Sequence, residues 1–215
     1  MTSDPLVSEP AARSRWPLAA VGAALVLAAI VLGAWIGWVR DQAPFAVDAA
    51  WALWISQHRG PVLLWASYAM NQIGGEWFGV IVLPLAITLA LFFARRRREA
   101  LFFIVACIVS AGAVQVLKHV VGRARPEEII VIADVGSYPS GHVANAATIA
   151  LALVVLVPRW WAYLLAVAWV LAMAFTRTFL GAHFITDTVG GTLLGVGAGL
   201  LIAAWVRPRP LVAPR

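Results

Sequence analysis

Three short stretches of the chain combine basic residues, histidines and an acid in a way that suits a reactive site. They read KHVVGRARP (118–126), PSGH (139–142) and TRTFLGAHFITD (176–187). The candidate residues in them are Lys118, Arg125, Ser140, Gly141, His142, Arg177, His183 and Asp187. Each stretch adjoins a long apolar segment, and ionisable residues in such a setting usually belong to a functional site.

Lys118, Arg125 and Arg177 are the basic members of this set, and they suggest an anionic ligand. Lys118 is the only lysine of the chain, and taken alone it is compatible with a side chain that extends from an apolar segment to the membrane surface. Three cations from different segments are less easily explained in that way. Because the planar guanidinium of arginine matches phosphate oxygens well, a phosphate group is the ligand that these residues favour.

The histidines and their neighbours suggest nucleophilic or acid–base chemistry. His183 and Asp187 are four residues apart, so on a helix they would share a face and form a hydrogen bond. Such an aspartate fixes the tautomer and leaves the other ring nitrogen free to attack or to accept a proton; a purely structural pair is the alternative. His142 offers a second imidazole. Ser140 can cap a helix or donate to an oxyanion, and Gly141 permits a tight turn.

The elements that must position these residues are membrane-spanning helices. The chain is 62% hydrophobic and only 12% charged, whereas a soluble domain is about a quarter charged. Crossing a bilayer takes roughly 17–25 predominantly apolar residues. The sequence therefore predicts an all-α, polytopic membrane protein, a six-transmembrane-helix bundle with spans at Trp16–Val39, Trp77–Ala94, Ala100–Leu117, Val143–Val157, Trp160–Phe175 and Thr188–Val206.

Two further features bear on how the spans are arranged. Residues 40–76, between the first two spans, contain several tryptophans, and such rings favour the membrane–water boundary. We predict an interfacial or re-entrant segment here, with an additional span as the alternative. In the last span Gly191, Gly195 and Gly199 recur at every fourth position, which is typical of close helix packing.

Arginine distribution predicts the orientation. Ten of the 16 basic residues fall in the N-terminal tail (1–15), in the loops after the second and fourth spans, and in the C-terminal tail (207–215). Short loops rich in arginine stay in the cytoplasm. Both tails are therefore expected to be cytoplasmic, flanking one domain of residues 16–206 in the cell membrane. The three polar stretches then share the extracytoplasmic face, which supports a composite site.

The remaining composition limits the partners. The net charge of +6 does not indicate a nucleic-acid partner, because the basic residues lie at span ends instead of clustering on a soluble face. No concentration of carboxylates and histidines suggests a metal, and no cofactor is expected. The single cysteine, Cys107, lies inside an apolar run and excludes an intramolecular disulfide.

In order and spacing, the three stretches resemble the signature of the type 2 phosphatidic acid phosphatase superfamily of integral membrane lipid phosphatases. The pattern is a lysine, six residues and Arg-Pro, then Pro-Ser-Gly-His, then an arginine, five residues, a histidine, three residues and an aspartate. The resemblance covers roughly residues 77–206. Thr176 stands where the family usually has serine, and threonine keeps the hydroxyl.

The resemblance implies a role for each candidate residue. His183 would be the nucleophile that forms a phosphohistidine, Asp187 would orient it, and His142 would protonate the leaving group and then activate water. The phosphate-binding residues would be Lys118, Arg125, Ser140, Gly141 and Arg177. Positioning and electrostatics carry most of phosphoryl transfer, so no metal is needed for this chemistry.

The substrate implied is a lipid phosphate, with membrane lipids as the other partner. An outward-facing site in a compact six-span frame favours a polyprenyl diphosphate such as the undecaprenyl carrier, with phosphatidate or phosphatidylglycerophosphate as the runner-up. A phosphate or lipid transporter is a less favoured hypothesis, because the charges are concentrated at one membrane face. Two other hypotheses are less favoured. The related vanadium-dependent haloperoxidases are soluble, whereas this chain is predicted to have six membrane spans. An inactive scaffold would not need every reactive residue, and all of them are present.

Overall fold

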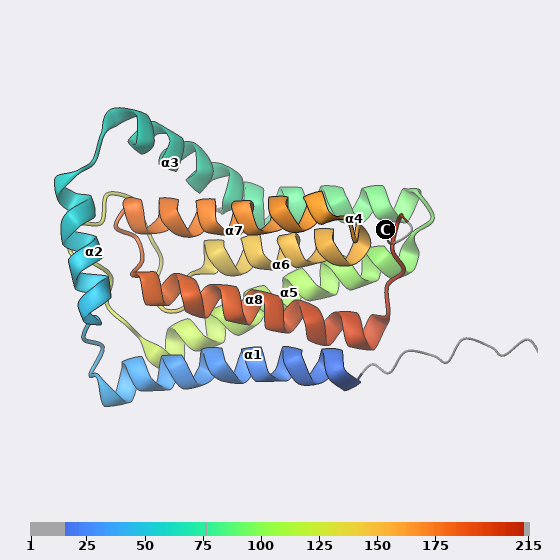
Figure 1. Cartoon of the computed structure of the whole chain (residues 1–215), viewed down its shortest axis with the longest axis horizontal. Coiled ribbons are helices and arrows are strands. Elements are labelled where there is room, and N and C mark those ends of the chain that lie inside the picture. Colours follow the sequence, from blue (N-terminus) through green and yellow to red (C-terminus); the bar gives the residue numbers. More distant parts are fainter. Residues whose placement is uncertain (1–15, 76, 213–215) are drawn as a thin grey trace, which may run out of the picture.

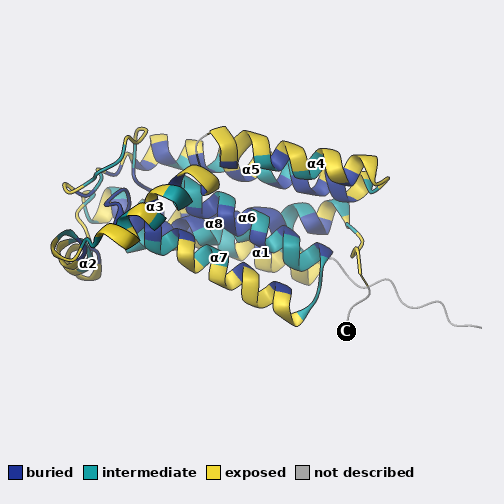
Figure 2. Ribbon diagram, turned by 90° about the horizontal axis from the view of Figure 1, so that it is seen from above, coloured by how far each residue is buried: buried dark blue, intermediate teal, exposed yellow. Residues whose placement is uncertain are grey.

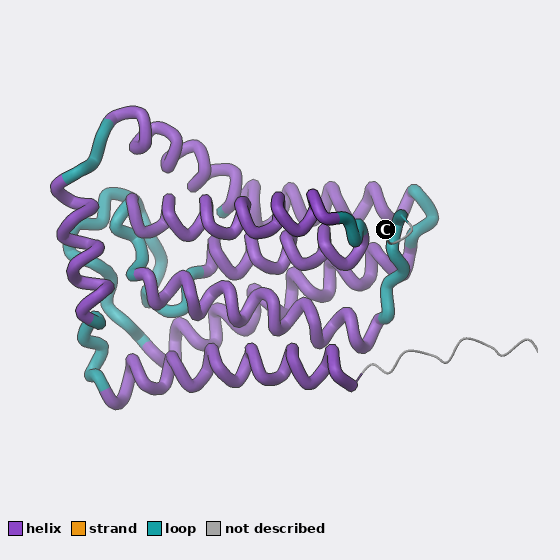
Figure 3. Tube along the Cα trace, in the orientation of Figure 1, coloured by secondary structure: helices purple, strands orange, loops and turns teal. Residues whose placement is uncertain are grey.

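The computed structural model describes residues 16–75 and 77–212, which form helices and connecting loops without a strand in those ranges (Figure 3). The helices are α1 (Trp16–Ala34), η1 (Trp35–Val39), α2 (Ala46–Gln57), α3 (Pro61–Gly74), η2 (Phe78–Val82), α4 (Leu83–Phe93), α5 (Arg97–Val121), α6 (Gly141–Leu156), α7 (Trp160–Phe179) and α8 (Ile185–Val206). The π-helical segments η1 and η2 continue α1 and lead into α4. The predicted all-α class is confirmed.

A helix occurs at the position of each predicted span, but the helices differ in length. Four of those in the described ranges are long and apolar enough to cross a membrane alone: α1 with η1, α5, α7 and α8. Helix α6 has 16 residues, and η2 with α4 reaches the required length only together with α3, from which it is bent by 42°. The structure thus has four or five such spans, and the count of six stays a prediction.

The bundle has two chemically different ends (Figure 1). The connections from α4 to α5 and from α6 to α7 lie at one end together with the last described residues. Arg95 and Arg96, the first residues of α5 (Arg97 and Arg98) and Arg159 are at this end. The three polar stretches lie at the other end. The N-terminal tail (1–15), with its two arginines, and residues 213–215 are outside the described residues, so their predicted side is not addressed by the fold.

Helices α6 and α8 form the interior of the bundle. Helix α8 packs against α1, α5 and α6, and α6 also packs against α7. Figure 2 shows buried residues concentrated on these inner helices and exposed ones on the outer faces. Large apolar side chains such as Leu27, Ile108 and Leu164 are exposed on those faces. This distribution suits a bundle whose surroundings are as apolar as its interior.

Glycines bring α8 close to α6, as the four-residue repeat predicts. A Cβ at Gly195 would lie 2.3 Å from the Ala144 carbonyl oxygen, and one at Gly191 would lie 2.5 Å from the Ser140 carbonyl oxygen. Neither backbone atom can move away easily. The same contact lets the Ser140 amide donate to the Asp187 carbonyl at 3.0 Å. Close packing therefore joins the PSGH stretch directly to the stretch that carries Asp187.

Residues 40–75 contain two helices, α2 and α3, at the end of the bundle that holds the polar stretches. Helix α2 crosses this end, and α3 descends at a slant toward α7 (Figure 1). Val47, Leu53 and Trp54 of α2 are exposed, whereas its Asp48 is buried. A short helix that presents apolar residues outward at the end of the bundle fits the predicted interfacial segment, whose depth in the membrane stays a prediction.

Candidate active site

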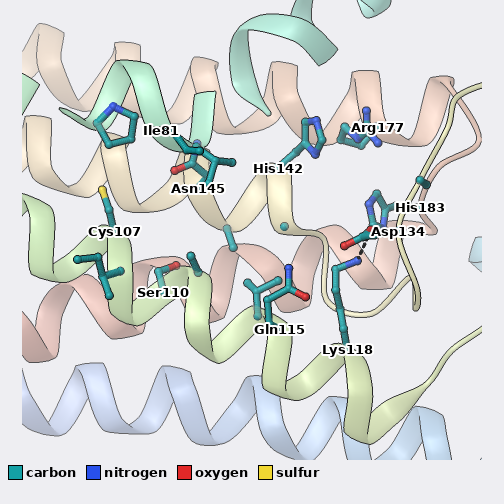
Figure 4. Close-up of a pocket in the computed structure, with 18 of the residues that line it drawn as sticks. Ile81, Cys107, Ser110, Gln115, Lys118, Asp134, His142, Asn145, Arg177 and His183 are labelled. Carbon is teal, nitrogen blue, oxygen red and sulfur yellow. Dashed lines mark hydrogen bonds and ion pairs between the residues drawn. The ribbon is translucent and has the colours of Figure 1, made fainter. Parts of the chain in front are cut away.

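The three polar stretches enclose a cavity of about 660 Å³. Its walls include the end of α5, the loop 122–140, the start of α6 and the connection from α7 to α8 (Figure 4). The predicted residues that line it are Lys118, Arg125, Gly141, His142, Arg177 and His183. Ser140 and Asp187 are buried beside the cavity. Residues that are far apart in the chain thus meet at one place, as a composite site requires.

His183 lies in the short connection before α8, and its ring is held in one tautomer. Its Nδ1 is 2.8 Å from the Ser137 carbonyl oxygen, and a carbonyl only accepts, so Nδ1 carries the proton. Nε2 therefore keeps its lone pair, 3.4 Å from the Arg125 guanidinium. Burial, followed by the cations Arg177, Arg125 and Lys118, holds the pKa of His183 well below its usual value. The ring is accordingly neutral and nucleophilic at neutral pH.

The predicted hydrogen bond between His183 and Asp187 is wrong. Asp187 Oδ2 is 3.7 Å from His183 Nδ1, beyond hydrogen-bonding distance. The reason is that His183 precedes the helix, which begins at Ile185, so helical geometry does not set the distance between the two side chains. Instead Oδ2 accepts the Phe184 amide at 2.9 Å, and Oδ1 accepts from Arg123 at 2.6 Å. Asp187 faces the ring as a nearby charge.

The three predicted cations reach the cavity from three elements. Lys118 is buried, which excludes the membrane-surface alternative, and its Nζ donates to the Gly136 carbonyl at 2.7 Å. Arg125 donates to the Ala182 carbonyl at 2.7 Å, which ties the loop 122–140 to the connection that carries His183. Arg177 of α7 donates to the Asn71 side chain of α3. Each cation is thus oriented by groups outside its own stretch.

A carboxylate that the sequence did not single out lies between two of these cations. Asp134 Oδ1 is 3.1 Å from Lys118 Nζ (Figure 4), and it is 2.7 Å from Arg125 Nη2. Burial disfavours its charge, but Lys118 and Arg125 outweigh that cost and lower the pKa of the carboxyl group. The side chain remains 56% exposed. A solvent-accessible carboxylate therefore binds the cations that would hold a phosphate.

The PSGH stretch leaves two polar atoms available. Ser140 occupies the N-cap position of α6, but its hydroxyl makes no capping hydrogen bond. In the described part of the chain, Ser140 Oγ and His142 Nε2 are buried without a hydrogen-bond partner. A Cβ on Gly141 would meet only Val114, at 3.5 Å, so the expected need for glycine in a tight turn is not found. The PSGH stretch therefore holds two unpartnered polar atoms, one on His142, which lines the cavity, and one on Ser140, which is buried beside it.

Sequence reasoning missed Asp48, Asn71 and Arg123 as well as Asp134. Asp48 and Asn71 come from α2 and α3, where only an interfacial role was expected, and both are buried. Arg123 lies inside KHVVGRARP and is fully buried against Asp48 and Asp187. Isolated polar residues in apolar helices were the available signal. Their partners, however, are set by how the chain folds over the end of the bundle.

Cationic side chains supply the positive charge at this cavity. Across residues 16–75 and 77–212, no group of three or more His, Cys, Asp and Glu side chains is arranged as metal ligands would be. Lys118, Arg125 and Arg177 instead surround a space next to two imidazoles. Such an arrangement can bind a tetrahedral anion, present a nucleophilic nitrogen to it and exchange a proton with a leaving group.

Comparison with known proteins identifies the family. A family model described as the PAP2 superfamily matches residues 99–210. The decaprenylphosphoryl-5-phosphoribose phosphatase of Mycobacterium tuberculosis is 30% identical over 147 residues, which are 66% of this chain and 80% of the relative. The undecaprenyl-diphosphatase of Sulfolobus acidocaldarius is 26% identical over 133 residues, 59% of this chain and 62% of the relative.

A solved structure agrees with this assignment. The crystal structure of a transmembrane PAP2-type phosphatidylglycerolphosphate phosphatase from Bacillus subtilis superposes with a TM-score of 0.73 and 26% identity. The alignment covers 86% of this chain and 94% of that chain. Since the family match spans more than half of the residues and includes all three polar stretches, the chain belongs to the PAP2 superfamily of phosphatases.

Proposed function

We propose that the chain hydrolyses a polyprenyl diphosphate or a closely related lipid phosphate at the extracytoplasmic face of the cell membrane. One observation carries the proposal: the cavity joins a cationic end to an apolar wall. The apolar residues of that wall, from η2, α4 and α5, are Val80, Ile81, Pro84, Leu85, Ile104, Cys107, Ile108 and Ala111. Such a cavity accommodates a phosphate together with the first part of an apolar tail.

The reaction starts from His183. Its Nε2 attacks phosphorus, the N–P bond forms, and the bond from phosphorus to the leaving oxygen breaks while His142 donates a proton to that oxygen. Water then attacks the phosphohistidine as His142 takes a proton from it, the N–P bond breaks, and inorganic phosphate leaves. Asp187 stabilises the positive charge that the phosphorylated ring carries. The neutral state and fixed tautomer of His183 support its role as nucleophile.

Charge stabilisation in this proposal comes from the protein alone. Lys118, Arg125 and Arg177 line the cavity and bind the equatorial oxygens. The Ser140 hydroxyl, unpartnered and buried beside the cavity, donates to one of them. The backbone amides at Gly141 and the following residues open α6, where the first N–H groups of a helix lack internal acceptors and favour anions. In most phosphoryl transfers such positioning and charge account for the bulk of the rate enhancement.

The names of relatives support a prenyl substrate. Two relatives act, by name, on decaprenyl and undecaprenyl compounds. Phosphatidylglycerophosphate or phosphatidate is the alternative substrate, because a structural relative is a phosphatidylglycerolphosphate phosphatase. We favour the prenyl diphosphate because the wall of the cavity is mostly aliphatic, with Ser110, Gln115 and Asn145 as the neutral polar side chains that could contact a glycerol headgroup.

A panel of lipid phosphates separates these possibilities. Purified protein in detergent would be given undecaprenyl diphosphate, undecaprenyl phosphate, phosphatidate and phosphatidylglycerophosphate, each with and without a chelator, and phosphate release would be measured. We expect the highest kcat/KM with the prenyl diphosphate and no loss of rate with chelator. A preference for either glycerolipid would overturn the substrate, and no release from any lipid would overturn the enzymatic proposal.

Orientation can be tested independently of activity. In a Cys107→Ser background, we expect Glu127→Cys, in the loop beside the site, to react with a membrane-impermeant maleimide in intact cells. Arg98→Cys, at the opposite end of the bundle, should react only after the membrane is permeabilised. Both positions are exposed, so access to the reagent depends on sidedness. The reverse labelling pattern would place the site in the cytoplasm.

Asp134 gives a prediction about phosphate affinity. Since its carboxylate binds Lys118 and Arg125, an incoming phosphate must displace it. We expect Asp134→Asn to lower both the KM for substrate and the Ki for inorganic phosphate by about two- to fivefold, the range of a partly exposed ion pair. Glu127→Gln, which removes an exposed carboxylate of the same loop, is the matched control. Weaker phosphate binding by Asp134→Asn would show that the carboxylate organises the cations instead of competing.

A further inference from the structure

A buried ionic cluster lies directly behind the proposed nucleophile. Its members are Asp48 of α2, Arg123 of the loop 122–140 and Asp187 of α8, and we call them the Asp–Arg–Asp cluster. We infer that Asp48 and Arg123 are positioning residues that act through Asp187 on the phosphorylation of His183. The inference rests on the role proposed above for His183, and it extends the site to a helix outside the three polar stretches.

Arg123 is the centre of the cluster. Its side chain is fully buried, its Nη1 is 2.6 Å from Asp187 Oδ1, and its Nη2 is 2.9 Å from Asp48 Oδ2. The guanidinium also lies 4.3 Å from the centroid of the Phe184 ring. A carboxylate keeps its charge in such a place only beside a cation. Arg123 therefore offsets part of the cost of burying the Asp187 charge and fixes its Oδ1, while Oδ2 lies 3.7 Å from His183 Nδ1.

Asp48 is held as firmly as Arg123. Its Oδ1 accepts the Thr186 amide at 3.0 Å, and its Oδ2 accepts the Thr186 hydroxyl at 2.6 Å. That hydroxyl in turn accepts from Arg123 at 2.8 Å. Thr186 adjoins Asp187, so Asp48 fixes both the guanidinium and the backbone from which the Asp187 side chain extends. Asp48 also accepts the Phe45 amide at the start of α2, at 3.3 Å, but its contacts with Arg123 and Thr186 converge on the position of the Asp187 carboxylate.

The charges of the cluster are balanced better when His183 is phosphorylated than in the resting protein. The cluster holds two acidic side chains and one guanidinium, so with both carboxylates ionised it has an excess negative charge next to a neutral His183. When His183 attacks phosphorus its ring becomes positive, and the excess negative charge then has a partner. A single carboxylate paired with Arg123 would already be neutralised and would stabilise the charged ring less. Asp48 therefore frees Asp187 to act on His183.

A purely structural cluster makes a different prediction from a positioning one. A buried ion pair that only joins α2 to the bundle would, when broken, lower stability and disturb all ligands alike. A cluster that prepares His183 would affect the bond to its Nε2 and spare simple anion binding, which depends on Lys118, Arg125 and Arg177. Inorganic phosphate and vanadate separate these two effects, because only vanadate forms a pentacoordinate adduct that resembles the transition state.

The test is Asp48→Asn in the full-length protein. We expect kcat to fall about 10- to 100-fold, the range typical of residues that orient a reacting group from behind it. KM and the Ki for inorganic phosphate should stay within about threefold, while the Ki for vanadate should rise with the loss of kcat. Arg123→Lys, which keeps the charge but not the two-sided geometry, should retain more activity than Arg123→Met.

The chain offers a matched control for the loss of a buried carboxylate. Glu99 is also buried, but it lies at the opposite end of the bundle, where it accepts the Arg209 amide at 2.9 Å. Glu99→Gln should lower the melting temperature without changing the ratio of the vanadate Ki to the phosphate Ki. Asp48→Asn should change that ratio even when its melting temperature matches that of Glu99→Gln.

The outcomes distinguish this inference from the proposed function. Full activity of Asp48→Asn, or a parallel loss of phosphate and vanadate binding, would overturn the positioning role while leaving the phosphatase intact. Activity that survives His183→Ala would overturn the assignment of the nucleophile itself. A selective loss of vanadate binding and kcat in Asp48→Asn, with His183→Ala inactive, would support both.

Discussion

Replacing His183 with alanine should reduce phosphate release by about four orders of magnitude or more, the scale seen when an enzyme loses its nucleophile. The expectation follows from the fixed tautomer, in which Nδ1 is committed to the Ser137 carbonyl and Nε2 faces the cations. Water in the vacated space is a much weaker nucleophile than the His183 ring. His142, the other histidine that lines the cavity in the described residues, extends from a different element, α6, and does not occupy the position of His183. Steady-state phosphate release from the preferred lipid provides the measurement.

Two readouts keep a folding defect from being mistaken for the loss of the nucleophile. Inorganic phosphate should still bind His183→Ala, because the three cations remain. His119→Ala is the matched control, since His119 is exposed on α5 and contacts the Gln115 carbonyl of its own helix; it should retain nearly full activity. Turnover of His183→Ala near the normal rate would remove His183 from the mechanism.

The second large effect is expected from His142→Ala. Loss of a general acid and base costs about 10²–10⁴ in rate, but the two chemical steps should not suffer equally. When a diphosphate is cleaved, the leaving group is itself a phosphate and needs little protonation. Attack by His183 can then proceed, whereas the water that must resolve the phosphohistidine lacks its base. Steady-state turnover should therefore fall while covalent phosphoenzyme accumulates.

Labelled phosphate on the protein measures that accumulation. With substrate radiolabelled in the terminal phosphate, His142→Ala should give an acid-labile, alkali-stable burst that approaches one phosphate per active chain. The double variant His142→Ala/His183→Ala should incorporate none, which assigns the label to His183. If His142→Ala turned over at the normal rate with no trapped label, the acid–base role would have to belong to another group.

The sequence predicts the helices and the cavity-lining residues well, for a physical reason. Apolar runs must span the bilayer, so consecutive loops alternate between its two faces. Counting the predicted spans therefore places the three polar stretches at the same end of the bundle, even when the packing of the helices is not known. The glycine repeat also indicates correctly that α8 approaches α6 closely. These inferences depend only on local pattern and on the thickness of the membrane.

The missing parts of the site depend on contacts that no local pattern encodes. Asn71 meets Arg177 across 106 residues, and Asp48 meets Thr186 across 138. Both contacts exist because α2 and α3 fold over the end of the bundle, which the composition of residues 40–76 does not specify. The missing hydrogen bond between His183 and Asp187 has a local cause, since i, i+4 spacing fixes the distance between two side chains only where the helix includes both residues.

The apolar wall of the cavity bears on how the substrate reaches the site and on which substrate concentration sets the rate. At about 660 Å³ the cavity has the size of a site for a drug-sized ligand, far smaller than a decaprenyl or undecaprenyl chain. Most of a long tail would therefore stay among the surrounding lipids during the reaction. The relevant concentration is then the mole fraction of substrate in the membrane leaflet. Diluting it with inert lipid should slow turnover even when the amount per volume of solution is unchanged, and lengthening the tail should change the rate little.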